Sequence, residues 1–274
     1  MKAPDFEYAR PETLADAIAL LGAHGADAMA LAGGQSLIPM MNFRVAAPEI
    51  LIDLDGLADL KGIQKNDNTL TIGAMTRYVE LMHNADVQAC APLISMALPH
   101  VAHDAIRNRG TLGGSLALAD PAAEMPAVMR TLDATVNLSG PQGSRAVKAD
   151  DFFAGYYETT RADDELIVSI DIPIAGPEHR FGFHEITQRH GDYALAGVAI
   201  SVVSNTWRVC FFGVCDHPVR LPDLETALAQ SHQDDHLLPH LDQIDFNGDL
   251  KASAATRKRL AGVALKRALG GMTV

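Results

Sequence analysis

The sequence predicts an α+β protein built from two or three subdomains, and three observations carry this prediction. Its 274 residues exceed what one typical domain core needs. Short apolar segments typical of strands alternate with segments whose apolar residues recur at helical spacing. An Ile-Ala-Gly-Pro stretch at residues 174–177 combines two strong breakers of regular structure and marks the clearest boundary.

The N-terminal part of the chain predicts strands and helices in alternation. Residues 5–9 favour a strand, and residues 11–21 favour a helix that we expect Gly22 and Gly25 to end. Three further elements follow, namely a strand at 28–31, a brief helix at 37–41 and a strand at 50–54.

The middle part predicts one antiparallel hairpin among further elements. Thr76 is a candidate N-cap for a helix at 77–82, and we expect Pro99 to disturb a helix at 92–103. A Ser-Gly-Pro-Gln-Gly turn at 139–143 predicts the hairpin. The strands predicted here are 69–72, 135–138, 145–147 and 165–172.

Beyond residue 177 the pattern predicts a β pair and a long helix. Residues 194–203 and 207–213 form the pair, and residues 252–269 form the helix. This helix is the most basic segment of the chain, with Arg257, Lys258, Arg259, Lys266 and Arg267. Either a solvated helix face or a docking surface for another subunit accounts for these charges.

Composition limits the classes of function. The chain is 48% hydrophobic and 20% charged, which indicates a folded protein. A net charge of −12 argues against nucleic acid or an anionic membrane as the main partner. The three cysteines lack CxxC spacing and are too few for a four-thiolate cluster. With no apolar signal region and no run of membrane-spanning length, we expect a cytoplasmic protein.

Two glycine-rich segments carry the most functional information. They are AGGQSLI at 32–38 and TLGGS at 111–115. Glycine lets the backbone approach a ligand closely, and successive N–H groups in such turns bind anions. Two similar segments favour a diphosphate held between loops, although each alone would also fit a tight structural turn. Neither has the spacing of a GxGxxG fingerprint or a P-loop.

Two later segments add candidate ligand contacts. In DPAAEMP at 120–126, Asp120 and Glu124 offer carboxylates to ribose hydroxyls, although Asp120 also fits a helix cap. In RHGDYA at 189–194, Tyr193 fits either a stacking ring or a surface tyrosine at a strand start. The sequence has no HExxH or GxSxG motif, so it predicts neither a metal site nor a serine nucleophile.

Three motifs in this order resemble the FAD-binding medium subunits of molybdenum hydroxylases. They are AGGQSLIPMMNFR at 32–44, RNRGTLGGSLALADPAAEMPAV at 107–128 and RHGDYALAGVA at 189–199. The resemblance is greatest to the carbon monoxide dehydrogenase medium chain and more distant to the xanthine dehydrogenase flavin domain. It implies two FAD-binding subdomains of the vanillyl-alcohol oxidase (PCMH) type, at 1–60 and 61–176, followed by a C-terminal α+β domain at 177–274.

The resemblance also implies which residues contact a non-covalent FAD. Its pyrophosphate would lie between two walls, the first made by Ala32, Gly33, Gly34, Gln35, Ser36, Leu37 and Ile38, and the second by Thr111, Gly113, Gly114 and Ser115. Asp120 and Glu124 would lie toward the ribose and adenine, Leu166 and Ile167 would flank the adenine, and Tyr193 would lie near the isoalloxazine. Several relatives carry a lysine where this chain has His184 and Glu185, which leaves Arg189 and His190 as candidate cations.

The implied activity is electron transfer within a complex. A large subunit would hold the molybdenum cofactor, a small subunit the [2Fe-2S] clusters, and this chain would pass electrons through FAD to an external acceptor. A dimer of such heterotrimers is the expected assembly. Two alternatives stay open: a stand-alone FAD-dependent oxidoreductase using Tyr193 or His190 as acid or base, and a scaffold subunit without flavin.

Overall fold

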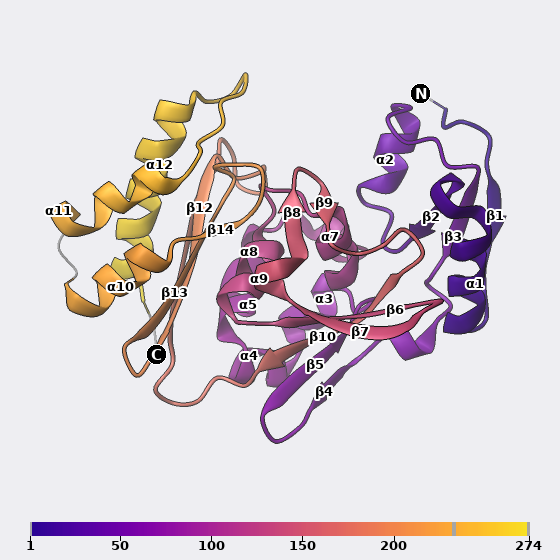
Figure 1. Cartoon of the computed structure of the whole chain (residues 1–274), viewed down its shortest axis with the longest axis horizontal. Coiled ribbons are helices and arrows are strands. Elements are labelled where there is room, and N and C mark those ends of the chain that lie inside the picture. The colour runs from indigo at the N-terminus through magenta and orange to yellow at the C-terminus, as the bar shows by residue number, and fades with distance from the viewer. Residues whose placement is uncertain (1, 232–233, 273–274) are drawn as a thin grey trace.

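The computed structural model describes residues 2–231 and 234–272 and contains three main β-sheets (Figure 1). The N-terminal sheet is parallel, in the order β1-β3-β2, and α1 packs on one face of it. Its elements are β1 (Glu7–Ala9), α1 (Leu14–His24), β2 (Ala28–Leu31), α2 (Leu37–Asn42) and β3 (Ile50–Asp53). All five predicted elements of this part are therefore present.

The first helix runs further than the sequence predicts. Thr13 caps its N-terminus, where its hydroxyl accepts from the Asp16 N–H at 3.1 Å. Gly22 does not end the helix, because helical backbone tolerates an interior glycine at a modest cost in stability. The helix ends at Gly25, whose φ of 54° breaks the helical path.

The middle sheet is antiparallel, in the order β4-β5-β10-β6-β7, and helices pack against it. Its strands are β4 (Ile63–Lys65), β5 (Thr69–Gly73), β6 (Thr135–Gly140), β7 (Gly143–Lys148) and β10 (Leu166–Pro173). The remaining elements of this part are α3 (Tyr78–His83), α4 (Ala85–Cys90), α5 (Pro92–Ala97), α6 (Asp104–Arg107), α7 (Leu112–Leu118), α8 (Glu124–Thr131), α9 (Ala149–Phe152), β8 (Phe153–Gly155) and β9 (Glu158–Thr159).

Two local predictions in this part meet different outcomes. The helix expected to be disturbed by Pro99 does end early, since α5 stops at Ala97 and a 3₁₀ turn follows. The predicted N-cap Thr76 is wrong. The Thr76 hydroxyl instead donates to the Gly62 carbonyl at 3.0 Å, and Arg77 is the residue that precedes α3. A threonine hydroxyl serves a neighbouring loop as readily as a helix end.

The C-terminal sheet is antiparallel, in the order β11-β12-β13-β14. Its strands are β11 (Arg180–Ile186), β12 (Ala196–Val203), β13 (Thr206–Phe212) and β14 (Val219–Arg220), and its helices are α10 (Pro222–Gln230), α11 (Asp234–Leu237) and α12 (Ala254–Gly270). The predicted β pair is present, with Ser204 and Asn205 at positive φ in the two-residue turn.

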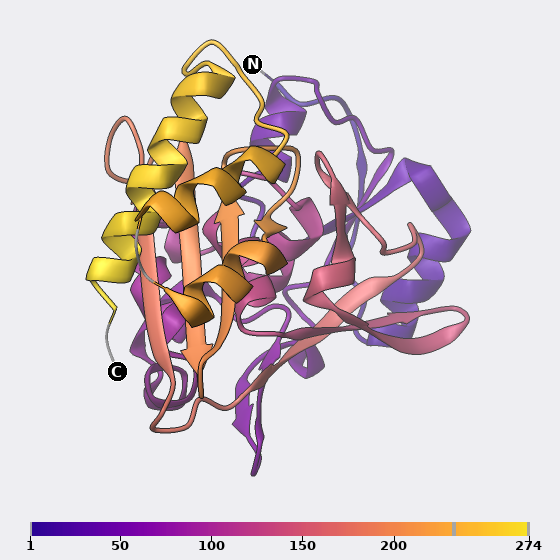
Figure 2. The ribbon, with the colours of Figure 1, turned by 60° about the vertical axis from the view of Figure 1, so that its left-hand side comes forward.

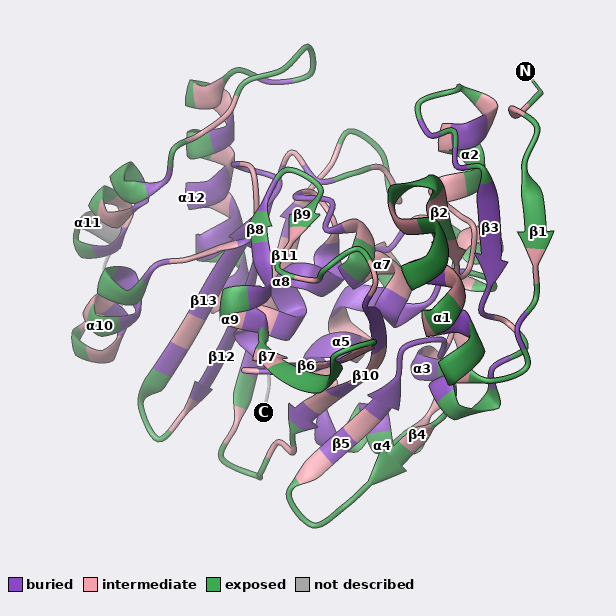
Figure 3. Cartoon of the chain, turned by 45° about the vertical axis from the view of Figure 1, so that its right-hand side comes forward, coloured by how far each residue is buried: buried purple, intermediate pink, exposed green. Residues whose placement is uncertain are grey.

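Helices cover both faces of the C-terminal sheet. Helices α10 and α12 lie on its outer face (Figure 2), while α5 and α8 lie between it and the middle sheet (Figure 1). Strand β12 is consequently buried along almost its whole length, whereas β1 and the outer side of α1 are largely exposed (Figure 3). Strands enclosed on both faces take a near-continuous apolar sequence, as β12 does.

Three of the five basic residues of α12 contact other groups of the same chain. The Arg257 guanidinium is buried and donates to the carbonyls of Leu195 and Gly213 and to Asp249. Lys258 pairs with Asp242, and Arg267 lies 3.3 Å from the His184 ring. These contacts favour a structural role for the helix over a free basic docking surface.

An ion-pair network joins α9 to the C-terminal sheet. The Asp150 carboxylate accepts from Arg208 at 2.7 Å and from Arg220 at 2.6 Å, and Arg130 of α8 lies 3.4 Å away. Burial alone would raise the pKa of Asp150, but the neighbouring guanidinium groups outweigh it and hold that pKa below its ordinary value.

We expect Asp150→Asn to lower the free energy of unfolding at pH 7 by about 2 kcal/mol, because it removes the carboxylate that three partly buried guanidinium groups share, although Arg220 keeps Glu225 and Arg208 keeps Asp133. Since the pKa of Asp150 is lowered in the folded chain, its stabilisation is present above pH 3.8 and disappears as pH falls through the folded value. Urea unfolding from pH 7 to pH 3 measures both effects. Asp67→Asn, at an exposed carboxylate, is the control. Equal stability of the two variants at pH 7 would contradict this role.

Candidate functional site

The structure brings the two glycine-rich segments into direct contact. A Cβ added at Gly33 would lie 2.2 Å from the Arg109 carbonyl oxygen, so only glycine allows this approach. A Cβ added at Gly114 would lie 3.4 Å from the Cβ of Ala32. The loop after β2 therefore packs against the segment that leads into α7, and the two segments expected to enclose the diphosphate lie side by side.

The first segment presents unpaired backbone donors. Gly34 takes a left-handed conformation with φ of 71°, and the Gln35 side chain donates to the Gly33 carbonyl at 2.9 Å. Within the part of the chain that the structure describes, the N–H groups of Gly34, Gln35, Ser36 and Leu37 donate to no protein acceptor. Four successive free donors at the start of α2 form a concavity suited to an anion.

The second segment is a helix start rather than a turn, so our prediction of two similar turns is wrong in this respect. Thr111 caps α7, and its hydroxyl accepts from the Gly114 N–H at 3.1 Å. The N–H groups of Leu112 and Gly113 bond to carbonyls of the Ala74–Thr76 loop. Gly113 is needed for close packing, because a Cβ there would lie 2.5 Å from the Cβ of Ala74.

The predicted carboxylates lie in a buried cluster close to this helix. Asp120 and Glu124 are 6% and 7% exposed. Asp120 accepts from the Ala122 N–H at 2.9 Å and from the Tyr157 hydroxyl at 3.3 Å, while Ala123 occupies the N-cap of α8. The helix-capping alternative for Asp120 is therefore wrong, since its side chain accepts a hydrogen bond within the loop that precedes α8 instead of from the helix itself.

Burial controls the ionisation of this cluster. It raises the pKa of Asp120, and with the Glu185 charge it raises the pKa of Glu124 to about 8. Burial and the Asp120 charge raise the pKa of Tyr157 to about 12. The site is therefore a region where protons are held more tightly than in water.

Tyr193 belongs to the same cluster. Burial and the charges of Asp120 and Glu124 raise the pKa of the Tyr193 hydroxyl, yet the residue is 57% exposed. The hydroxyl therefore faces the carboxylates while much of the side chain is open to solvent. Gly191, with φ of 82°, places the loop against Ala102, where a Cβ would meet the carbonyl at 2.5 Å.

Leu166 and Ile167 begin β10, and both side chains are buried. Leu166 packs with the core beneath α1, whereas Ile167 packs with the core of the middle sheet. Their position near an adenine stays a prediction. The motifs do not predict Tyr78, Tyr157 and Glu185 as neighbours of the carboxylates, because each comes from a distant element that no local motif connects to them.

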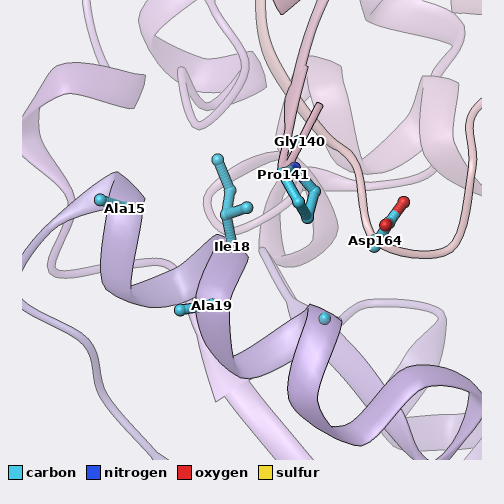
Figure 4. Close-up of a pocket in the computed structure, with 7 residues that line it drawn as sticks. Ala15, Ile18, Ala19, Gly140, Pro141 and Asp164 are labelled. Carbon is cyan, nitrogen blue, oxygen red and sulfur yellow. The ribbon is translucent and has the colours of Figure 1, made fainter. Parts of the chain in front are cut away.

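A separate shallow groove lies between α1 and the β6–β7 turn (Figure 4). Its volume is about 600 Å³, and it is lined by Ala15, Ile18, Ala19, Gly22, Gly140, Pro141 and Asp164. None of the predicted site residues lines it. Its mostly apolar wall offers few polar groups to fix a nucleotide, so the glycine segments remain the candidate site.

Comparison with known proteins gives matches over almost the whole chain. Residues 4–175 match the family described as the FAD binding domain in molybdopterin dehydrogenase. The chain is 35% identical to the carbon monoxide dehydrogenase medium chain of Afipia carboxidovorans, covering 96% of this chain and 95% of the relative. It is 34% identical to the caffeine dehydrogenase subunit beta of Pseudomonas sp., covering 98% and 95%.

The fold comparison agrees with the sequence comparison. A solved carbon monoxide dehydrogenase from Hydrogenophaga pseudoflava, lacking the Mo-pyranopterin moiety of its cofactor, matches with a TM-score of 0.94 and 36% identity, covering 98% of both chains. This match confirms the α+β class and agrees with the PCMH-type fold. Among residues 2–231 and 234–272, no helix combines the length and apolar character needed to span a membrane.

The family model covers more than half of the chain, and the related medium chains cover almost all of it. The resemblance drawn from the three motifs is confirmed. The chain belongs to the family of FAD-binding domains of molybdopterin dehydrogenases and is an FAD-dependent oxidoreductase subunit of the molybdenum hydroxylase class.

Proposed function

We propose that this chain holds FAD against the Gly34–Leu37 loop and transfers electrons from [2Fe-2S] clusters of a small partner subunit to an external acceptor. Substrate oxidation would take place at the molybdenum cofactor of a large partner subunit. The observation that carries the proposal is the run of four free N–H groups beside α7. A dimer of heterotrimers in the cytoplasm is the setting we propose.

The residues present fit an FAD diphosphate. The free N–H groups of residues 34–37 supply donors without any cationic side chain, and Gly33 and Gly34 leave the backbone accessible. We propose that Ala32 and Ile38 complete this wall and that Thr111, Gly113, Gly114 and Ser115 form the opposite wall. Because the N–H groups at the start of α7 are already bonded, the Ser115 hydroxyl, which also contacts the Tyr78 hydroxyl, is the donor we expect from that side.

Bound FAD would supply reversible electron transfer, and the protein would supply position and electrostatics. We propose that Asp120 and Glu124 contact the ribose and adenine side, with Leu166 and Ile167 flanking the adenine. The exposed part of Tyr193 would face the isoalloxazine, while its hydroxyl is held toward Asp120. These residues orient the cofactor, and no side chain is required to act as a nucleophile.

The stand-alone oxidoreductase is less well supported than the complex subunit. It needs an acid or a base near the cofactor, and the raised pKa of Tyr193 keeps that hydroxyl protonated at neutral pH, so Tyr193 could serve only as an acid and His190 is the candidate base. A scaffold subunit without flavin would give no ligand to the unpaired N–H groups of residues 34–37. We propose the division of the chain into 1–60, 61–176 and 177–274, with the diphosphate between the first two parts.

We expect Gly34→Ala to weaken FAD binding at least tenfold. A Cβ at residue 34 is disfavoured at φ 71° and would lie 3.2 Å from the Ile38 side chain, so the backbone must shift and the N–H groups of residues 34–37 would move from their present positions. Flavin fluorescence titration of the flavin-free chain measures the affinity. Gly62→Ala is the control, because Gly62 also has positive φ and its Cβ would meet nothing within 4 Å. Affinities of both variants within threefold of the parent would contradict the anion site at residues 34–37.

We expect Tyr193→Ala to change the flavin absorption bands and the rates of flavin reduction and reoxidation by about tenfold, with unfolding altered by less than about 1 kcal/mol since much of the side chain is exposed. Stopped-flow absorbance with dithionite and then with an acceptor measures these rates. Tyr156→Ala removes a similarly exposed tyrosine and is the control. Unchanged spectra and rates in Tyr193→Ala would rule out a role beside the ring.

A further inference from the structure

A short segment, residues 101–109, touches two loops that come from distant parts of the chain. At one end, the Arg109 carbonyl packs against the loop after β2, where a Cβ added at Gly33 would lie 2.2 Å from the carbonyl oxygen. At the other end, the Ala102 carbonyl packs against the loop after β11, where a Cβ added at Gly191 would lie 2.5 Å from the oxygen. The segment is therefore a spacer between these two loops.

The two loops carry the two ends of the proposed flavin site. The loop after β2 supplies the N–H groups of residues 34–37, which donate to no described acceptor and which we propose bind the diphosphate. The loop after β11 supplies Tyr193, which we propose faces the isoalloxazine and whose hydroxyl interacts with the Asp120 carboxylate. One FAD molecule has to reach both loops, so the spacing between the loops has to match the length of the cofactor.

The segment begins in a conformation that its own sequence does not favour. Ala102 has a φ of 44°, in the left-handed region where a Cβ crowds the following carbonyl oxygen. Gly191, which packs on it, also has positive φ, but glycine adopts φ of 82° at little cost. A strained alanine persists only where surrounding contacts hold it in place, and such residues cluster at functional sites.

Arg107 supplies the contacts that hold this strained backbone. Its Nη1 donates to the Val101 carbonyl at 2.7 Å and to the Ala102 carbonyl at 3.1 Å, and its Nη2 donates to the Asp104 carboxylate. The Arg107 side chain is 11% exposed, so these charge-assisted bonds are largely shielded from solvent. The Ala102 oxygen that Arg107 holds is the same oxygen that Gly191 packs against. The guanidinium therefore acts on the loop after β11 through one carbonyl group.

We propose that Arg107 is a positioning residue for Tyr193. By holding the Ala102 carbonyl in its left-handed turn, Arg107 seats Gly191 and fixes Tyr193 at the distance from the diphosphate loop that a bound FAD requires. The proposal rests on the proposed function for its ligand, whereas the seating of the loop needs no ligand. Arginine is required because its planar guanidinium presents separate nitrogens to the carbonyls and to Asp104, whereas lysine offers a single nitrogen.

The first test needs no flavin. Within the loop after β11, the N–H groups of Asp192 and Leu195 form backbone hydrogen bonds, and amide hydrogen exchange of the flavin-free chain measures how firmly these bonds are held. In Arg107→Lys we expect both to exchange about tenfold faster, because local opening of the loop becomes easier. Arg161→Lys is the matched control, since Arg161 donates to three carbonyls of another loop. Equal exchange at Asp192 and Leu195 in the two variants would overturn the proposal.

A second test uses the FAD-loaded chain. We expect Arg107→Lys to change the flavin absorption bands and the rate of flavin reduction by dithionite in the same direction as Tyr193→Ala, because Tyr193 transmits the effect. In the Tyr193→Ala background, the further change from Arg107→Lys is less than about twofold, since the two substitutions act by one route. Rate effects of the two substitutions that multiply independently would contradict a role through Tyr193.

Gly191→Ala covers the case in which Arg107→Lys does not fold. Its Cβ would meet the Ala102 oxygen at 2.5 Å and is disfavoured at φ 82°, so it displaces the loop from the other side of the same contact. We expect faster exchange at Asp192 and Leu195 in this variant too, and unaltered exchange would overturn the proposal. A parent chain that binds no FAD contradicts the proposed function alone, and hydrogen exchange then decides the role of Arg107 by itself.

Discussion

The close approach of two backbones at Gly33 is the constraint on which the candidate site depends. The loop after β2 can touch the Arg109 carbonyl only because no side chain stands between them. This contact sets the N-terminal sheet against the segment that starts α7. The next four N–H groups, those of residues 34–37, donate to no acceptor among the described residues. Glycine thus serves packing at one residue and ligand access at the next.

The layer formed by α5 and α8 connects this site to the C-terminal sheet. Helix α8 packs on β12 and β13, and α5 packs on β11. The charge of Glu185 on β11 contributes to the raised pKa of Glu124 in the first turn of α8. The same loop after β11 delivers Tyr193 to Asp120. Arg257 of α12 donates hydrogen bonds to the carbonyls of Leu195 and Gly213 and so links the helix to the segments beside Tyr193 and after β13. The C-terminal part of the chain therefore contributes Tyr193 and the Glu185 charge to the surroundings of Asp120 and Glu124.

The sequence predicted those elements whose signal is local. Strand β2, the β6–β7 hairpin and the β12–β13 pair each combine an apolar pattern with an adjacent turn, and each is present. Strand β11 was missed, because buried polar residues such as Glu185 interrupt its apolar alternation. The helical form of the second glycine segment was also missed, since Gly113 serves close packing on Ala74 and Gly114 lies against Ala32, and neither forms a turn. Clusters such as Tyr78 with Glu124 depend on tertiary packing, which no sequence spacing records.

Binding of FAD by the backbone N–H groups of residues 34–37 is tested most directly by comparing ¹H–¹⁵N amide spectra of the chain with and without FAD. If these groups hold the diphosphate, the largest shifts fall on Gly34, Gln35, Ser36 and Leu37, with smaller shifts around Ser115 and Tyr193. Shifts concentrated instead along the groove between α1 and the β6–β7 turn, or none at saturating FAD, would contradict it.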